Sequence, residues 1–514
     1  MLILNIALSV SLAATSTLAE CADPPCMIRM GLWKQEPPAE NAYVNSALRN
    51  FNRFAANPAF KMGADVGRNL NRIAGANAMA IMNHYDQAYY ANISFGTPPQ
   101  QTVVQIDTGS AAFWIGSKAC NDVKNCNDLY PFDSSKSSTF MNISSGKPSN
   151  VTYGAGSIGG VMASDVMNWG SFTIPKQQFI LVDYEDPTIF YQQNGTVSGL
   201  VGFAYQGGLQ PTVSAMGYYE TPIYSMVRMG MISQPLFSIW LNGSTTGGIQ
   251  TMNGGEVIIG GVDPARYNGD IMYYPIVNVS KSYFWMVEIT NVQIVGTLDA
   301  TKPTAPLSIT PLNLTTTYGL MDSGTSLITI DPNFYTLQLL PTLQKKSVGK
   351  PVTLTTDLNT GYTRVACTDA QRLPSIAMTF GGKGVSGSQP SFEITWQDYV
   401  LSDAQGCYLG FQAMNMKNTG EGNPVWIFGD VFLRKVFTVY DFGNGGRVGL
   451  AYAANTGKAF GVPLNAQSIP DVPSVKVDNA TASTSKKSAA ATAAGGWSFA
   501  ATSAMLVCTI FALA

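Results

Sequence analysis

The sequence predicts an all-β protein made of two related halves, and two observations support this prediction. Residues 104–110 (VQIDTGS) and 319–326 (GLMDSGTS) share one pattern: an apolar run, then Asp, Thr or Ser, Gly and another hydroxyl residue. From residue 88 to residue 454, short alternating apolar segments are separated by turns rich in Gly, Asn and Ser, which is typical of β-strands. A β-rich unit that occurs twice explains both observations.

Each copy of the motif predicts a buried strand that carries one carboxylate into a tight turn. Glycine lets the backbone pass close to a neighbouring group, and small hydroxyl residues flank the acid. A single copy would be weak evidence, because Asp, Gly and Ser also occur in ordinary surface turns. Two copies in matching apolar frames, 215 residues apart, indicate that Asp107 and Asp322 act together as catalytic acids.

Composition narrows the chemistry that this chain can perform. Its formal net charge of −2 and its lack of long basic runs give no electrostatic case for nucleic acid as a partner. The single histidine, His84, precedes the first predicted strand, so we expect it to be a bystander. Because nucleophilic Ser or Cys catalysis needs a histidine base and most zinc sites use histidine, carboxylates remain as the acid and base groups.

On these motifs the chain resembles the pepsin-like aspartic proteases, over about residues 86–454. The resemblance implies two β-rich lobes with an active-site cleft between them. It also implies that Asp107 and Asp322 share one proton and activate a water that attacks a peptide bond, without metal or organic cofactor. The aspartic-protease pair is itself the standard example of such proton sharing. By the same resemblance, the residues that support the pair are Thr108, Gly109, Ser110, Ser323, Gly324 and Thr325.

The strands of the first half can be followed in order. Residues 89–95 alternate, a turn covers 96–99, and residues 103–106 lead into the first motif. Residues 151–161 predict two strands around a Gly-rich turn. They resemble the flap of the family, in which Tyr153 and Gly154 close over substrate and Trp114 supports the tyrosine. The alternative is an ordinary hairpin in which Tyr153 is only a packing residue.

A second repeated element supports the two-lobe prediction. Residues 199–203 (GLVGF) match residues 425–430 (VWIFGD), and in the family such segments pass behind each Asp-bearing loop. Residues 431–451 resemble the closing strands. Four apolar residues are candidates either for walls of the substrate pockets, which would favour cleavage between bulky apolar residues, or for plain core. They are Ile189, Phe190, Leu200 and Phe284.

The N-terminal segments differ from the rest of the chain. Residues 1–19 predict a secretory signal peptide with an apolar core and a small-residue cleavage site. Residues 20–80 hold more basic than acidic residues, with loose helical periodicity at 46–56 and 66–74. We expect a basic propeptide whose cations pair with the catalytic carboxylates until acid weakens the pairing; an ordinary solvated extension is the alternative. The N-terminal lobe, with Asp107, then covers 81–265, and the C-terminal lobe, with Asp322, covers 266–454.

The composition changes again after residue 454. Residues 455–496 are rich in Ser, Ala, Thr and Pro and predict a stalk. Residues 497–514 form an apolar tail that is too short and too mixed for an ordinary membrane-spanning helix. Small residues, a spacer and a short apolar end match a glycosylphosphatidylinositol (GPI) signal, an arrangement like that of the yapsins. A retained membrane anchor and a soluble enzyme are the alternatives.

Cysteines and glycosylation sequons fit the secretory pathway. Seven cysteines suggest disulfides, and the resemblance implies the bridges Cys120–Cys126 and Cys367–Cys407. Cys21 could pair with Cys26, and Cys508 lies in the tail. Eight Asn-x-Ser/Thr sequons are candidate glycosylation sites: Asn92, Asn142, Asn150, Asn194, Asn242, Asn278, Asn313 and Asn479.

We therefore predict an aspartic endopeptidase that is made as a zymogen and acts at acid pH on protein and peptide substrates. It would be a monomer tethered by a lipid anchor at the plasma membrane or cell wall, or held in an acidic vacuole-like compartment. One alternative is a catalytically silent pepsin-like cell-surface binding protein, which the intact Asp pair disfavours. The other is a carboxylate-pair glycosidase, which would require neither two matching motifs nor a flap.

Overall fold

The structure is a computed structural model of the chain, which divides into two units, Met1–Pro473 and Ser474–Ala514. All the residues that it describes lie in the first unit. They are residues 27–35, 76–84, 88–122, 126, 128, 130–153, 156–186, 197–205, 220–232, 234–243, 254–277, 284–296, 308–357, 361–382, 385, 389–403, 405–416, 422–443 and 445–454.

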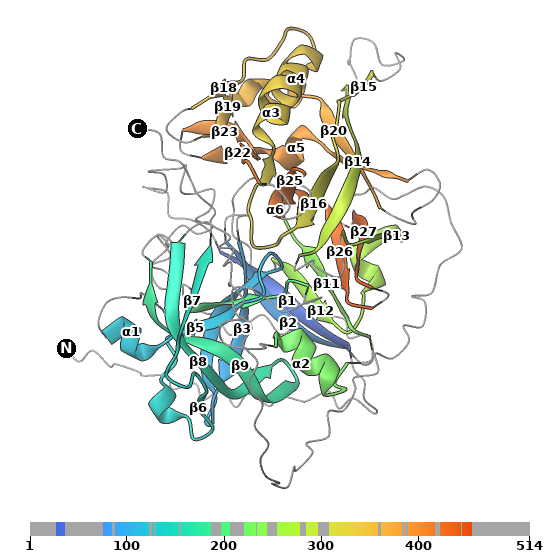
Figure 1. The fold of residues 1–514 in the computed structure, drawn as a ribbon. Coiled ribbons are helices and arrows are strands. Elements are labelled where there is room, and N and C mark those ends of the chain that lie inside the picture. The colour runs from blue at the N-terminus through green and yellow to red at the C-terminus, as the bar shows by residue number, and fades with distance from the viewer. Residues whose placement is uncertain are drawn as a thin grey trace, which may run out of the picture. The chain divides into compact units, whose positions relative to one another are not determined.

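The predicted all-β class is confirmed, because strands in three sheets make up most of the regular structure (Figure 1). The largest sheet has 15 strands. In spatial order they are β13 (Tyr267–Pro275), β27 (Arg447–Ala453), β26 (Val436–Asp441), β11 (Leu236–Leu241), β12 (Gly255–Ile259), β1 (Met27–Gln35), β2 (Ala76–His84), β3 (Ala88–Phe95), β4 (Gln100–Asp107), β10 (Gly199–Gly202), β5 (Phe113–Gly116), β9 (Phe172–Glu185), β8 (Gly156–Trp169) and β6 (Met141–Asn142), with β7 (Pro148–Tyr153) paired to β8.

The other two sheets belong to the C-terminal half of the chain. The eight-stranded sheet runs β21 (Ser391–Ile394), β20 (Ser375–Gly381), β14 (Met286–Val295), β16 (Thr317–Met321), β25 (Val425–Phe428), β17 (Ile328–Ile330) and β24 (Phe411–Ala413), with β15 (Ile309–Pro311) paired to β14. The four-stranded sheet runs β18 (Thr355–Thr356), β19 (Thr363–Val365), β23 (Gly406–Leu409) and β22 (Val400–Asp403).

Helices are short and lie between strands. The α-helices are α1 (Lys118–Asp122), α2 (Pro222–Arg228), α3 (Pro332–Phe334), α4 (Leu340–Lys346), α5 (Trp396–Tyr399) and α6 (Asp430–Leu433). The 3₁₀-helices are η1 (Ser134–Lys136), η3 (Pro264–Arg266) and η5 (Cys367–Arg372), and η4 (Tyr335–Leu339) is a π-helical segment between α3 and α4. Their ends follow local chemistry: the Asp331 side chain accepts two backbone N–H groups at the start of α3, as capping acids commonly do.

The 15-stranded sheet connects the two halves of the chain. Strand β11 of the first half pairs antiparallel with β26 of the second, from Leu236 opposite Asp441 to Trp240 opposite Phe437. One main cluster of buried apolar residues extends from Tyr89 to Tyr452 and includes Trp114, Trp169, Trp285 and Trp426. The two β-rich halves therefore share a sheet and a continuous core.

Two strands that precede residue 88 were not predicted from the sequence. Strand β1 lies within the predicted propeptide and pairs with both β12 and β2, and β2 crosses the predicted boundary at 80/81 and ends at His84. His84 therefore does not precede the strands, contrary to the prediction. Strand β1 pairs with residues more than 220 positions away in β12, and no local pattern in the sequence predicts such a partner.

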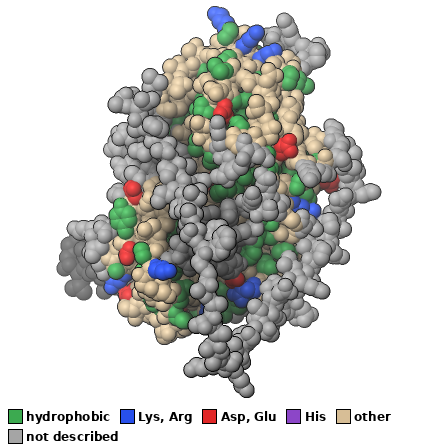
Figure 2. Space-filling view, in the orientation of Figure 1, with side chains coloured by type: hydrophobic (Ala, Val, Ile, Leu, Met, Phe, Trp, Pro, Cys, Tyr) green, Lys and Arg blue, Asp and Glu red, His purple; other side chains and the backbone are tan. Residues whose placement is uncertain are grey.

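Several predicted segments lie outside the described residues: the signal peptide 1–19, the helical stretches 46–56 and 66–74, the stalk 455–496 and the tail 497–514. Within the described part of the chain, no helix combines the length and apolar character needed to cross a membrane. Figure 2 shows charged side chains scattered over the coloured surface of one face, among small apolar patches.

Candidate active site

The two Asp-bearing loops have the same strand framework. Asp107 is the last residue of β4, which runs parallel to β10, and Gly202 lies opposite Asp107. Asp322 follows β16, which runs parallel to β25. Behind each loop a returning strand, β5 or β17, pairs antiparallel with the same partner, β10 or β25. The segments GLVGF and VWIFGD therefore lie behind the two motifs, as the repeat predicted.

Glycine is required where each backing strand meets its loop. A Cβ atom at Gly202 would overlap the backbone of residues 110–112, and one at Gly429 would overlap the carbonyl groups of Thr325 and Leu327. The backbone N–H groups of Gly202 and Gly429 donate to the carbonyl oxygens of Ala112 (2.8 Å) and Leu327 (3.2 Å). Close approach without a side chain makes these bonds possible.

Each aspartate is held by two donors from its own loop. The Asp107 carboxylate accepts the Gly109 N–H at 2.9 Å and the Ser110 hydroxyl at 2.5 Å. The Asp322 carboxylate accepts the Gly324 N–H at 2.8 Å and the Thr325 hydroxyl at 2.5 Å. The donors to Asp107 and the donors to Asp322 occupy equivalent positions in the two motifs. Both acids are buried, with 2% and 3% of their surface exposed, so the donors fix the orientation of the carboxyl planes.

Reciprocal hydrogen bonds join the two loops. The Thr108 N–H donates to Ser323 Oγ at 3.2 Å, and the Ser323 N–H donates to Thr108 Oγ1 at 2.9 Å. Each hydroxyl also donates to a strand carbonyl in the other half, Thr108 to Met321 (2.8 Å) and Ser323 to Ile106 (3.0 Å). A Cβ atom on Gly109 would overlap the Asp322 carboxyl group. The first loop therefore lies directly against the second aspartate.

Comparisons with known proteins agree with this geometry. Residues 88–453 match the family model described as eukaryotic aspartyl protease. The chain is 31% identical to mouse (Mus musculus) gastricsin over 371 residues, which cover 72% of this chain and 82% of the relative. It is 29% identical to pepsin A of Suncus murinus over 435 residues, which cover 84% and 96%.

The chain belongs to the eukaryotic aspartyl protease family. It is an aspartic endopeptidase of the pepsin family, a hydrolase that acts on protein or peptide substrates. Both disulfides suggested for this protease, Cys120–Cys126 and Cys367–Cys407, are present. Of the sequons, Asn142, Asn150 and Asn313 are exposed and Asn92 and Asn242 are half-buried; Asn194, Asn278 and Asn479 lie outside the described residues.

The hairpin of β7 and β8 occupies the position of the suggested flap. Tyr153 ends β7 and pairs with Gly156 at the start of β8, and its hydroxyl oxygen accepts the Trp114 indole N–H at 3.0 Å. Trp114 lies on β5, immediately after the first motif, and is fully buried. This hydrogen bond links the hairpin to the strand that follows the Asp107 loop. Gly154 lies outside the described residues.

The two candidate pocket residues that the structure describes lie in different clusters. Leu200 is buried in the main core, opposite Trp114, which favours the core interpretation for this residue. Phe284 is half-buried and packs on a separate cluster of buried residues, Met286, Tyr318, Leu320, Val425 and Ile427. Ile189 and Phe190 lie outside the described residues.

Sequence reasoning missed an aromatic group beneath the two loops. The Trp285 indole N–H donates to the carbonyl oxygen of Phe203 at 2.7 Å, and its own carbonyl oxygen accepts the Met321 N–H at 3.1 Å. Tyr440 packs edge-on against Trp285 and stacks on Phe237. Apolar runs in the sequence indicated burial at these positions, but no local pattern could show that distant aromatics meet under the aspartates.

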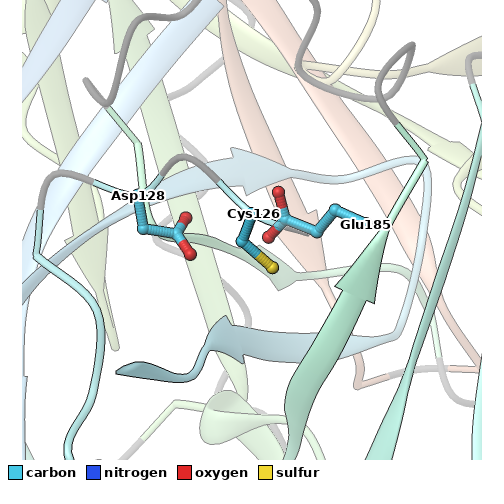
Figure 3. A group of neighbouring side chains, drawn as sticks. All are labelled: Cys126, Asp128 and Glu185. Atoms are coloured by element: carbon cyan, nitrogen blue, oxygen red, sulfur yellow. The ribbon is translucent and has the colours of Figure 1, made fainter. Parts of the chain in front are cut away.

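A second buried acid pair was also missed. Figure 3 shows the carboxyl groups of Asp128 and Glu185 pointing toward one another on either side of Cys126, with one candidate ligand atom from each of the three residues within 4.8 Å of the others. Cys126 is bonded to Cys120 and therefore offers no thiolate to a metal ion. Asp128 Oδ2 and Glu185 Oε1 have no hydrogen-bond partner among the described residues.

Burial is the main cause of the raised pKa values of Asp128 and Glu185. Loss of hydration raises the pKa of Asp128 to about 8. Loss of hydration and the nearby Asp128 charge raise the pKa of Glu185 well above its ordinary value. Both groups are therefore protonated in the folded protein under acidic conditions, where repulsion between them is absent. Glu185 lies opposite Ile158, close to the turn of the β7–β8 hairpin, so ionisation would destabilise this part of the protease.

We predict that Gly109→Ala lowers kcat by about 100-fold or more, because the new methyl group displaces the Asp322 carboxyl group and misplacement of this order costs about that much. The measurement is steady-state cleavage of a quenched peptide, with circular dichroism as the check on folding. Gly243→Ala is the matched control, since its Cβ would meet only the flexible side chain of Arg434. Equal activity of both variants would contradict the arrangement.

We predict that the free energy of unfolding falls as pH rises from about 4, where an unfolded Asp begins to ionise, to about 8, the folded pKa of Asp128. A raised folded pKa means that the folded chain keeps a proton that the unfolded chain has released, so stability is lost across this window. Asp128→Asn should flatten the dependence in urea titrations at pH 4.5 and 7.5, performed on an inactive background to prevent self-digestion. The exposed Asp183→Asn is the control, and an unchanged slope in Asp128→Asn would argue against the pair.

Proposed function

We propose that Asp107 and Asp322 are the catalytic pair of this endopeptidase. The observation that carries the proposal is the equivalence of their surroundings: each carboxylate accepts one backbone N–H and one hydroxyl from its own loop. The reciprocal bonds of Thr108 and Ser323 hold the loops together. Thr108, Gly109, Ser110, Ser323, Gly324 and Thr325 are the supporting residues in this proposal.

The pair would work by sharing one proton and one water molecule. The deprotonated carboxylate takes a proton from the water as it attacks the scissile carbonyl, and the protonated carboxyl group polarises that carbonyl by a hydrogen bond. Both roles exchange during the cycle, so neither belongs permanently to Asp107 or to Asp322. The mechanism forms no covalent enzyme intermediate and requires no group beyond the two carboxyls.

We propose that the β7–β8 hairpin closes over an extended peptide, which would gain strand-like backbone hydrogen bonds. Tyr153 would cover the substrate, with Gly154 in the turn and Trp114 holding the tyrosine through its indole N–H. A preference for bulky apolar residues beside the cleaved bond is part of this proposal, with the half-buried Phe284 as a candidate pocket residue.

We propose the domain order that the composition suggests. A signal peptide (1–19) and a basic propeptide (20–80) would precede the N-terminal lobe (81–265) and the C-terminal lobe (266–454). The propeptide would keep the enzyme a zymogen until acid weakens its ionic contacts. The pairing of β1 with β12 supports a close association of this segment with the enzyme.

We propose that the stalk (455–496) and the tail (497–514) attach the protease through a GPI anchor. The cell surface, as plasma membrane or wall, would then be its place of action, with an acidic vacuole-like compartment as the second candidate. The small residues and short apolar end support the anchor, and the two disulfides fit an oxidising compartment.

We predict that the full chain cleaves an apolar quenched peptide with a bell-shaped pH profile on the acid side, because one carboxyl must be ionised and the other protonated. Asp107→Asn should lower kcat by about 10⁴-fold or more and stop removal of residues 20–80. Peptide fluorescence and mass spectrometry of the N-terminus measure the two outcomes.

Asp322→Asn should behave like Asp107→Asn, since both acids take part in every cycle. The exposed Asp183→Asn is the control that changes charge away from the pair. An inactive wild-type chain at every pH, with the propeptide shown to be absent, would favour the silent peptide-binding protein instead.

We predict that phosphatidylinositol-specific phospholipase C releases the protease from intact cells in soluble form, because only the lipid would hold it there. Immunoblotting of the medium and of the cell pellet measures the release. A chain truncated after residue 454 is the control and should appear in the medium without the lipase. Retention of the full chain after treatment, with release by detergent alone, would indicate a retained membrane-spanning anchor.

A further inference from the structure

The hydroxyl group of Tyr440 lies next to the hydrogen bonds that join the two Asp-bearing loops. Tyr440 is on β26, is completely buried, and has its hydroxyl oxygen 3.4 Å from Thr108 Oγ1. Thr108 is 332 residues away in the sequence. Thr108 Oγ1 is also the atom that accepts the Ser323 N–H, so the tyrosine contacts the central atom of the connection.

Packing fixes the position of this hydroxyl. The Tyr440 ring stacks on Phe237, with centroids 4.6 Å apart and planes at 11°. The edge of Trp285 packs against it at 5.3 Å. Trp285 itself forms hydrogen bonds with both halves of the chain: its indole N–H donates to the Phe203 carbonyl, and its own carbonyl accepts the Met321 N–H. A ring confined in this way has little freedom to move its oxygen away from Thr108.

The Thr108 hydroxyl has two acceptors within reach. It donates to the Met321 carbonyl at 2.8 Å and, over a longer distance of 3.4 Å, to the Tyr440 hydroxyl oxygen. Thr108 Oγ1 also accepts the Ser323 N–H at 2.9 Å, which is within the capacity of a hydroxyl group. Tyr440 therefore offers a second acceptor to the hydroxyl that joins the two loops.

This contact makes the connection asymmetric. Ser323 Oγ donates to Ile106 and accepts the Thr108 N–H, and in the described part of the chain it has no third partner comparable to Tyr440. Desolvation by burial, together with the charges of Asp322 and Asp430, raises the pKa of Tyr440. The phenol therefore stays neutral at any pH at which the protease would work, and its oxygen remains an acceptor for Thr108.

We propose that Tyr440 is a positioning residue of the active site: its hydroxyl oxygen accepts from Thr108 Oγ1 and holds the cross-loop hydrogen bonds in the geometry that aligns Asp107 with Asp322. This inference rests on the proposed function of the two aspartates. The tyrosine acts through Thr108 and touches neither substrate nor water. Proton sharing between the two acids depends on their close alignment, so a looser connection should weaken it.

The test is Tyr440→Phe, which keeps the ring and removes only the hydroxyl. We expect kcat to fall roughly fivefold, the effect of one ordinary hydrogen bond, with KM unchanged because no substrate contact is lost. The acid limb of the pH profile should move to higher pH by about a few tenths of a unit, because weaker proton sharing raises the pH at which the first carboxyl group ionises. Phe237→Leu, which removes the ring that stacks on Tyr440, should shift the limb in the same direction by less.

Tyr399→Phe is the matched control. Tyr399 is also completely buried, and its hydroxyl donates to the Pro374 carbonyl at 2.5 Å, within the C-terminal half. Its loss should lower the melting temperature without moving kcat or the pH profile. A Tyr440→Phe enzyme with the wild-type kcat and profile, or one that differs only in melting temperature like the control, overturns the proposal.

Two further outcomes are distinguishable. If wild type and all variants fail to cleave peptide, the proposed function fails before Tyr440 can matter. If Tyr440→Phe does not fold, Phe237→Leu decides, because an unmoved acid limb in that variant would count against a positioning role for Tyr440.

Discussion

The reciprocal hydrogen bonds between Thr108 and Ser323 are the constraint on which the rest of the structure depends. They join backbone and hydroxyl groups 215 residues apart in a buried site, where an unsatisfied donor would cost about 1–3 kcal/mol. They can form only when β4 and β16 deliver their ends to the same place. The shared sheet, in which β11 pairs with β26, and the continuous core supply that alignment. The geometry of the active site therefore depends directly on the association of the two halves.

The two halves use the same strand framework around each Asp-bearing loop, which accounts for the similar geometry of the two aspartates. Gly202 and Gly429 permit equivalent close approaches, and the donors to Asp107 and Asp322 correspond residue by residue. The departures from symmetry are equally informative. Tyr440 interacts with Thr108, and the described residues give Ser323 no equivalent partner. The Asp128–Glu185 pair lies in the first half of the chain. A symmetric frame can thus acquire one-sided features without disturbing the loops that it supports.

A feature can be predicted from the sequence when its residues lie close together in the chain, and it is missed when they lie far apart. The Asp-Thr/Ser-Gly motifs, the backing segments and the Tyr153 hairpin are local patterns, and their resemblance to the aspartic proteases predicts that they meet in one site. Tyr440, Trp285 and Asp128 carry no such pattern, because their roles arise from partners more than 30 residues away. Strand β1 was missed for a related reason: its partner β12 lies more than 220 residues away in the sequence.

The order of strands in the large sheet also determines when the protein can become active during its synthesis. Its interior strand β11 ends at residue 241, but the partner strand β26 begins only at residue 436. A nascent chain that already contains Asp107 therefore still lacks Asp322, Tyr440 and the strands that bring the loops together. Such long-range pairing is slow to form and comes late. The two Asp-bearing loops can therefore come together only after nearly all of the β-rich chain has been synthesised.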